Sequence, residues 1–217
     1  MVDDSSVLAR LLFPPVCLGC GLLLRPDAPP QLPLCRRCGL EHEPLPPTAR
    51  VHDEIWAVHA YGGPLLRALT RLKFQHQAAW AGPLGSLLAG SPVFDPTRWD
   101  ALVPIPLHPR RQRERGFNQA TLLARHARRR GARIPLRPRW LRRVRATAPQ
   151  HRLPSPARRH NLDQAFVAPR PARVAGRRVL LIDDVTTTGA TFIAARQALL
   201  AAGAQAVGAL ALLRTLA

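Results

Sequence analysis

The sequence predicts an α/β fold in which a parallel sheet is flanked by helices, joined to a small cysteine-rich module at the N-terminus. Strand-like and helix-like apolar segments alternate between residues 55 and 213, as in parallel sheets whose strands are connected by helices. Residues 179–182 are wholly apolar, too few for a helix, and typical of a strand buried on both faces. All four cysteines lie in a proline-rich segment without such periodicity. We therefore expect two domains, residues 1–50 and 51–217.

The elements of the α/β domain follow from apolar periodicity and from the turn residues between the periodic segments. The predicted strands are residues 55–61, 101–107, 179–182 and 206–213. The predicted helices are residues 65–74, 78–88, 117–130 and 192–202. The two prolines within residues 101–107 suit the end of a strand that turns into a loop. Residues 131–176 are rich in arginine and proline, and we expect a long mobile loop or hood there.

Two carboxylates and a threonine-rich turn follow the apolar run at residues 179–182. Asp183 and Asp184 are expected where the strand ends, the edge at which open α/β sheets bind ligands. The next turn opens a helix, so its backbone N–H groups suit a phosphate. The acids repel a phosphate, but they can accept hydrogen bonds from vicinal sugar hydroxyls or lie near a divalent cation. A ribose phosphate fits both halves, and a generic polar corner is the alternative. The turn residues are Thr186, Thr187, Thr188, Gly189 and Thr191.

The net charge of +19 is confined to one segment. Residues 110–178 contain 21 arginines against two acids, Glu114 and Asp163, whereas the rest of the chain is balanced, with 11 basic and 11 acidic residues. Such an excess indicates a polyanionic partner, either pyrophosphate or nucleic acid or both. The single lysine and abundant alanine are also typical of a GC-rich coding sequence, which favours arginine independently of binding. That alternative does not explain why acids are missing from the same segment.

The four cysteines form two CxxC pairs separated by 14 residues, Cys17 with Cys20 and Cys35 with Cys38. Two such turns can complete a tetrahedral site with four sulfur ligands, and the separation is just below the usual zinc-ribbon range of about 15–20 residues. Disulfides and a thioredoxin-like redox centre are the alternatives. The first needs an oxidising compartment, and the second a CxxC that opens a helix after a strand. We predict one structural zinc ion that builds an interaction surface.

Residues 179–191 resemble the phosphoribosyl pyrophosphate (PRPP) loop of the type I phosphoribosyltransferases. With the RGFNQ stretch at residues 115–119, the cysteine pairs, and the segments 141–150 and 158–166, the chain is similar to the ComF (ComFC-type) competence proteins. The similarity runs from about residue 13 to residue 213. It implies a phosphoribosyltransferase-like domain with an N-terminal zinc finger, acting in the uptake of single-stranded DNA during natural transformation.

The resemblance also implies roles for particular residues. Asp183 and Asp184 would hold the ribose hydroxyls, and residues 186–191 would wrap the 5′-phosphate of PRPP, which carries Mg²⁺ on its pyrophosphate. Asn118 and Gln119 would begin the next helix. The arginine-rich turn before them would face the pyrophosphate, and the only lysine is a further phosphate contact; solvated surface charges and a helix-end cation are the alternatives. These cations are Arg110, Arg111, Arg115 and Lys73. The candidate DNA contacts are Arg128, Arg129 and Arg130.

Three functions stay open, because the PRPP loop specifies a ligand and not turnover. The chain is a DNA-uptake protein that binds PRPP, a phosphoribosyltransferase of nucleotide metabolism, or a regulator that senses PRPP or a nucleotide without catalysis. No segment indicates a pocket for a purine, pyrimidine or orotate acceptor. Our prediction is the first of these functions, with single-stranded DNA and a competence helicase as partners.

No signal peptide or membrane-spanning segment is predicted, since the N-terminus carries Asp3 and Asp4 and the longest uncharged stretch is broken by glycines. We therefore expect a cytoplasmic protein. Its recruitment to the inner face of the membrane by the DNA-uptake machinery would follow from the resemblance.

Overall fold

The computed structural model describes residues 15–25, 32–46, 49–75, 77–130, 134–145 and 165–215. Outside these ranges lie residues 1–14, 26–31, 47–48, 76, 131–133, 146–164 and 216–217. Residues 131–133 and 146–164 belong to the predicted hood. The strands are β1 (Arg50–His52), β2 (Ile55–Ala60), β3 (Ala101–Pro104), β4 (Arg142–Arg143), β5 (Phe166–Val167), β6 (Arg178–Thr186) and β7 (Ala206–Arg214). The α-helices are α2 (Arg36–Leu40), α3 (Gly63–Phe74), α4 (Ala81–Ala89), α5 (Pro109–Arg115), α6 (Gln119–Arg130) and α8 (Ala190–Ala201), and two 3₁₀ turns are η1 (Ala78–Trp80) and η3 (Pro171–Arg173).

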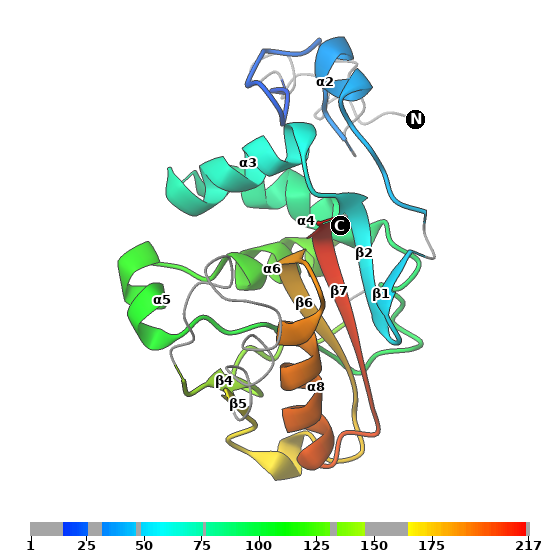
Figure 1. The fold of residues 1–217 in the computed structure, drawn as a ribbon, viewed down its shortest axis with the longest axis vertical. Helices are drawn as coiled ribbons and strands as arrows, with labels where there is room; N and C mark the ends of the chain where they lie inside the picture. The colour runs from blue at the N-terminus through cyan, green and yellow to red at the C-terminus, as the bar shows by residue number, and fades with distance from the viewer. Residues whose placement is uncertain are drawn as a thin grey trace.

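The central sheet has five strands in the order β1-β2-β7-β6-β3 (Figure 1). Strands β2, β7, β6 and β3 are parallel, and only β1 pairs antiparallel, at the edge beside β2. Helices α3, α4 and α6 pack on one face and α8 on the other, so alternate residues of β6 enter two separate cores. The predicted parallel sheet flanked by helices is confirmed.

Strand β6 shows why the central sheet is apolar without interruption. Leu180 and Ile182 enter the core beneath α3, α4 and α6, whereas Val179 and Leu181 enter the core beneath α8. All four side chains are fully buried, as expected for a parallel strand covered on both faces. The four predicted strands are all present, and each lies within two residues of its predicted start.

The predicted end of this strand was wrong. The run was expected to stop at Ile182, but β6 continues to Thr186, because its backbone stays in register with β7 as far as the pair Thr186 and Arg214. On the other side, β3 ends opposite Ile182. Asp183 and Asp184 therefore lie within the last half of β6, where one edge of the strand is no longer covered by β3.

Three other elements differ from the sequence predictions. The turn predicted after β3 contains a helix, α5, and the second CxxC pair, expected to form a turn, opens the short helix α2. Part of the predicted hood is ordered as a two-stranded antiparallel sheet of β4 and β5. Within the described residues, none of the helices has the length and apolar character needed to cross a bilayer.

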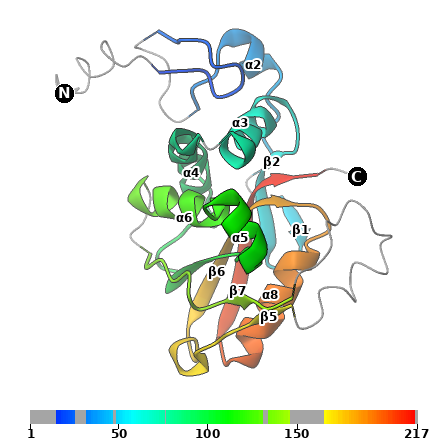
Figure 2. The same cartoon turned by 90° about the vertical axis from the view of Figure 1, so that its left-hand side faces the viewer.

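The N-terminal module lies beyond α3, at the carboxyl-terminal edge of the central sheet (Figures 1 and 2). A connecting strap returns from the module along β2, where the amide of Leu45 donates to the carbonyl of Val58 at 3.1 Å and that of Ala60 to Glu43 at 3.1 Å. Helix α3 is thus positioned between the module and the edge of the sheet where Asp183 and Asp184 lie.

Candidate functional site: a cationic cavity at the sheet edge and a four-cysteine cluster

A cavity of about 580 Å³ opens at the carboxyl ends of β3 and β6. This edge is a crevice because β3 is followed by α6 on one face of the sheet and β6 by α8 on the other. The volume falls within the range of about 300–1,000 Å³ that is usual for ligand pockets. The structure brings most of the predicted ligand residues to its lining: Lys73, Arg111, Arg115, Asp183, Asp184, Thr186, Thr187, Gly189 and Thr191.

Two acids in the last half of β6, Asp183 and Asp184, form the acidic part of the cavity lining. The amide of Asp184 donates to Oδ1 of Asp183 at 2.9 Å, and Oδ2 of Asp184 lies 2.5 Å from Nζ of Lys73 on α3. Burial and the adjacent Asp184 carboxylate raise the pKa of Asp183 well above its usual range. Lys73 is thus the cation that pairs with Asp184, and Asp183 is the acid whose ionisation is disfavoured.

The turn after β6 presents the N-terminus of α8 to the same cavity. Gly189 is the N-cap of the helix and has φ 79°, a left-handed conformation that favours glycine. A Cβ atom at this position would also lie 3.1 Å from Cδ1 of Ile55. Gly189 has no side-chain oxygen with which to cap the helix. The N-terminus of α8, with its positive partial charge, lies at the cavity wall, which suits an anion.

The opposite wall is cationic. Arg111 and Arg115 come from α5, and Arg143 comes from β4. Burial lowers the pKa of the Arg115 and Arg143 guanidinium groups, which the nearby carboxylates of Asp184 and Asp183 respectively oppose. Arginine stays charged under these conditions, so partly desolvated cations face the cavity and would interact with an anion more strongly than surface arginines do.

Two predicted ligand residues do not line the cavity. Nε of Arg110 donates to Oε1 of Glu114 at 3.0 Å on the outer face of α5, and Thr188 lies at the exposed tip of the turn. Conversely, sequence reasoning missed Arg143, Tyr61 and Phe74, which do line it. No local motif marks them, because the fold brings them to the cavity from three separate segments.

The predicted start of the helix after the arginine-rich stretch lies beside the cavity. Nδ2 of Asn118 donates to the carbonyl of Ile105 at 2.9 Å, and its Oδ1 accepts from the amide of Thr121 at 3.4 Å, which caps α6. Gln119 lines the cavity and accepts from Nη1 of Arg115 at 2.7 Å. These contacts fix the orientation of the Arg115 guanidinium.

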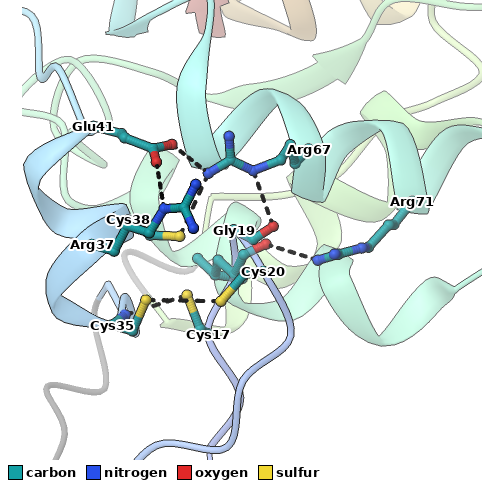
Figure 3. Close-up of polar contacts among 10 residues, drawn as sticks. Cys17, Gly19, Cys20, Cys35, Arg37, Cys38, Glu41, Arg67 and Arg71 are labelled. Atoms are coloured by element: carbon teal, nitrogen blue, oxygen red, sulfur yellow. Dashed lines mark hydrogen bonds and ion pairs between the residues drawn. The ribbon is translucent and has the colours of Figure 1, made fainter.

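The four cysteines form one cluster. The sulfur atoms of Cys17, Cys20, Cys35 and Cys38 all lie within 4.8 Å of one another, and all four are free thiols. The sulfurs of Cys20 and Cys35 are 3.8 Å apart (Figure 3). Four sulfurs at about 2.3 Å from one ion are separated by about 3.8 Å in a tetrahedron. The cluster therefore fits a metal ion such as zinc.

Arg67 on α3 joins the cluster to the rest of the protein (Figure 3). Its Nη2 donates to Oε2 of Glu41 at 2.7 Å and to the sulfur of Cys38 at 3.5 Å, and its Nε donates to the carbonyl of Gly19 at 3.2 Å. Nη1 of Arg71, one turn later, donates to the carbonyl of Leu18 at 3.4 Å. The same helix also carries Lys73 into the cavity, so the cluster and the cavity share one supporting element.

Arg67→Met is expected to weaken zinc binding about 10- to 100-fold, the usual cost of losing a contact to a metal ligand. Competition against a chromophoric chelator measures this affinity. Arg37→Met is the matched control, because Arg37 pairs with Glu41 at 3.4 Å and lies exposed on α2, where its bond partner among the described residues is this carboxylate and not a sulfur atom. Equal zinc affinities of Arg67→Met and the native chain would contradict the role given to Arg67.

The predicted DNA contacts lie outside both sites. Arg128 and Arg129 are exposed near the end of α6, and Arg130 ends that helix. Gln119, at the other end of α6, lines the cavity. At about 1.5 Å per residue, Arg128 is roughly 14 Å further along the helix. The structure therefore separates these arginines from the cavity.

Together, these features define an open-sheet α/β protein with a cationic ligand cavity at its carboxyl edge and a docked four-cysteine module. The chain is 36% identical over 223 residues to DNA utilization protein YhgH of Escherichia coli (strain K12), covering 93% of this chain and 91% of that protein. It is 32% identical to competence protein F of Haemophilus influenzae, covering 81% and 80%, and 30% identical to competence protein ComFC of Bacillus subtilis, covering 98% and 91%. The chain belongs to the ComF family of competence and DNA utilization proteins.

Two further comparisons add little to this assignment. No family model matches the chain. The glutamine PRPP amidotransferase of Bacillus subtilis superposes on 62% of this chain and 26% of its own, with 24% identity and a TM-score of 0.41. That overlap is partial, and the assignment to a family rests on the sequence relatives.

Proposed function

We propose that the protein binds PRPP in the cavity and acts in the uptake and handling of single-stranded DNA. The observation that carries the first half is that three kinds of group line one cavity. These are the acids Asp183 and Asp184, the N-terminal residues of α8, and the arginines Arg111, Arg115 and Arg143. PRPP carries a partner for each of them, with a ribose that has two free hydroxyls, a phosphate and a pyrophosphate.

Each part of PRPP has a stated place in this proposal. The 5′-phosphate binds the N–H groups of the first turn of α8, and the ribose hydroxyls donate to Asp183 and Asp184. The pyrophosphate, carrying Mg²⁺, faces Arg111 and Arg115. Lys73 pairs with Asp184 in the absence of a ligand, and in this proposal it turns toward a phosphate when the ribose hydroxyls bind that carboxylate.

Calorimetry with PRPP and its two fragments tests the assignment. A cavity that contacts both ends should bind PRPP at least tenfold more tightly than either ribose 5-phosphate or pyrophosphate at the same Mg²⁺ concentration. If pyrophosphate alone binds as tightly as PRPP, the acids and the turn contribute nothing, and the cavity is a general anion site.

The role in DNA handling is supported by the family and by surface charge. The relatives are named for competence and for DNA utilization. The exposed residues of α5 and α6 include more arginines than a pyrophosphate can use: Arg110, Arg113, Arg125, Arg128 and Arg129. In this proposal the four cysteines hold a structural zinc ion, the module is an interaction surface for DNA or a helicase, and the protein works in the cytoplasm, at the inner face of the membrane.

Binding of single-stranded DNA should be mainly electrostatic. We expect log K to fall against log [salt] by about 0.7 for each phosphate neutralised. Replacing Arg128, Arg129 and Arg130 by glutamate should reduce this slope and the affinity while PRPP binding is retained. Fluorescence anisotropy of a labelled oligonucleotide across a salt series measures both.

The matched control reverses Arg170 and Arg173, which are exposed around η3, away from α6. If this control weakens DNA binding as much per charge as the α6 substitutions, net charge alone explains the binding. If the native chain has no affinity at low salt, the arginine excess reflects base composition and the role in DNA binding is wrong.

A further inference from the structure

The turn between the first two cysteines is docked on α3. Arg67 and Arg71 lie four residues apart, on one face of the helix. They donate to successive carbonyls of the turn, those of Gly19 and Leu18 (Figure 3). Gly19 has no room for a side chain, because a Cβ atom there would lie 2.6 Å from Cβ of Pro64, near the start of α3. The metal-binding turn therefore fits closely against this helix.

Leu18, inside this turn, enters the core of the α/β domain. Its side chain is fully buried and belongs to the apolar cluster that contains Leu65, Leu69 and Leu72 of α3. One residue of the cysteine module is thus part of the packing that supports α3. Structural sites of four cysteines fold with their metal, so we expect the position of Leu18 to depend on metal binding.

Helix α3 also supplies part of the wall of the cavity. Its lining residues are Leu66, Leu69, Thr70, Lys73 and Phe74. Among them, Lys73 makes the contact with Asp184. Lys73 lies six residues after Arg67, which is about 9 Å along the helix at about 1.5 Å per residue. A shift of α3 at the cysteine turn would therefore also move Lys73 relative to the acids of β6.

We propose that the four-cysteine module is a positioning device for the cavity, and that α3 couples metal binding to ligand binding. With the metal bound, the turn holds α3 through Leu18, Arg67 and Arg71, and Lys73 is fixed beside the acids. Without the metal, the turn releases α3, and Lys73 loses its fixed position. The inference rests on the proposed function in that it takes PRPP as the ligand of the cavity.

This coupling has to be reciprocal. If zinc raises the affinity for PRPP by some factor, PRPP raises the affinity for zinc by the same factor, because the two binding free energies are linked. Couplings between two sites usually amount to about 5- to 150-fold. A module that is only tethered to the α/β domain would give a factor of one.

Titrations of the full chain measure the factor in both directions. Calorimetry gives the PRPP affinity of the zinc-loaded chain and of the chain stripped by a zinc chelator that spares Mg²⁺. Competition with a chromophoric chelator gives the zinc affinity with and without PRPP. We expect both ratios to be about 5 to 150 and equal to each other. In Asp183→Ala/Asp184→Ala, the control for zinc bound by free PRPP, PRPP should not change the zinc affinity.

Variants of the turn locate the coupling. Leu18→Ala keeps all four sulfur ligands but removes the side chain that enters the core, so its ratio should fall toward one. Leu18→Met refills the space and should restore the ratio. Arg71→Met removes one carbonyl contact without emptying the core and should lower the ratio. Leu22→Ala is the matched control, because Leu22 follows the same cysteine pair but is 59% exposed, and it should keep the native ratio.

The coupling and the proposed function fail in different ways. Equal PRPP affinities of the zinc-loaded and zinc-free native chain, or a native ratio in Leu18→Ala, overturn the coupling even where PRPP binds. Should Leu18→Ala not fold, the ratio of Arg71→Met gives the same decision. If the zinc-loaded native chain does not bind PRPP, the proposed function is wrong, and hydrogen exchange of residues 63–74 decides the coupling. Faster exchange there on zinc removal, with α8 unchanged, supports it, and unchanged exchange overturns it.

Discussion

Replacing Asp183 and Asp184 together by alanine is expected to weaken the binding of PRPP by about 2–4 kcal/mol, or about 30- to 900-fold. Asp184 would lose a charged hydrogen bond to a ribose hydroxyl, a contact worth about 1.5–3 kcal/mol, and Asp183 a further hydrogen bond worth about 0.5–1.5 kcal/mol. The contact of Asp184 with Lys73 is lost as well, so the cation is left without its partner. Calorimetric titration with PRPP at fixed Mg²⁺ measures the change.

Asp183→Asn separates ligand binding from folding. The pKa of Asp183 is raised in the folded protein by burial and by Asp184, so its native form holds the proton more tightly than the unfolded chain does. The stability contributed by this group is present below the ordinary aspartate pKa and is lost as pH rises toward the folded value. At neutral pH the variant should therefore unfold no earlier than the native chain, while binding PRPP less tightly. Unchanged PRPP affinity in the double variant would contradict the assignment of the acids.

Cys38→Ser is expected to abolish stoichiometric zinc binding and to unfold the N-terminal module. Structural zinc sites of this type have apparent binding free energies of about 10–16 kcal/mol, which is also the free energy that folds the module. Cys38 is the sulfur that Arg67 contacts, so one of the contacts between the module and α3 is lost too. The sheet core should persist, because its two apolar clusters are formed mainly by the strands and helices of the α/β domain.

Elemental analysis gives the zinc content, and circular dichroism with limited proteolysis reports which part unfolds. Leu40→Ala is the control, since Leu40 is 84% exposed on the same helix and is not a ligand. The native chain should contain one zinc per molecule. Native protein that is folded without metal, or that has its cysteines paired as disulfides, would contradict the metal assignment.

The sequence predicted the parallel sheet well because strand burial leaves a strong local signal. The apolar run at residues 179–182 is too short for a helix and is typical of a buried strand, and the segment 206–213 is similarly apolar. The end of β6 was not predictable in this way. Three of the four residues 183–186 are polar and indicate a turn, yet pairing with β7 keeps the segment in the strand.

Helix α5 was missed because its sequence, PRRQRER, has no apolar face and every residue except Arg115 is exposed. Its start is visible only in retrospect, with Pro109 at the first helical position and His108 as a cap. A short helix with no buried stripe leaves no periodicity to detect.

In the candidate site too, residues with a local sequence signal could be predicted and residues brought in by tertiary contacts could not. The acids and the threonine turn could be found because they form one contiguous motif. Arg143 and Phe74 could not, because they reach the cavity from β4 and from α3, and only the tertiary structure brings these segments together. The contact of Lys73 with Asp184 joins residues 111 positions apart, and nothing in either local sequence predicts it.

A crystal structure of the zinc-loaded protein grown with PRPP and Mg²⁺ is the sharpest test of PRPP binding in this cavity. We expect density for one PRPP molecule, with its 5′-phosphate at the N-terminus of α8, its ribose on Asp183 and Asp184, and its pyrophosphate facing Arg111 and Arg115. Density for PRPP elsewhere on the protein, or a cavity without PRPP at saturating concentration, would contradict it.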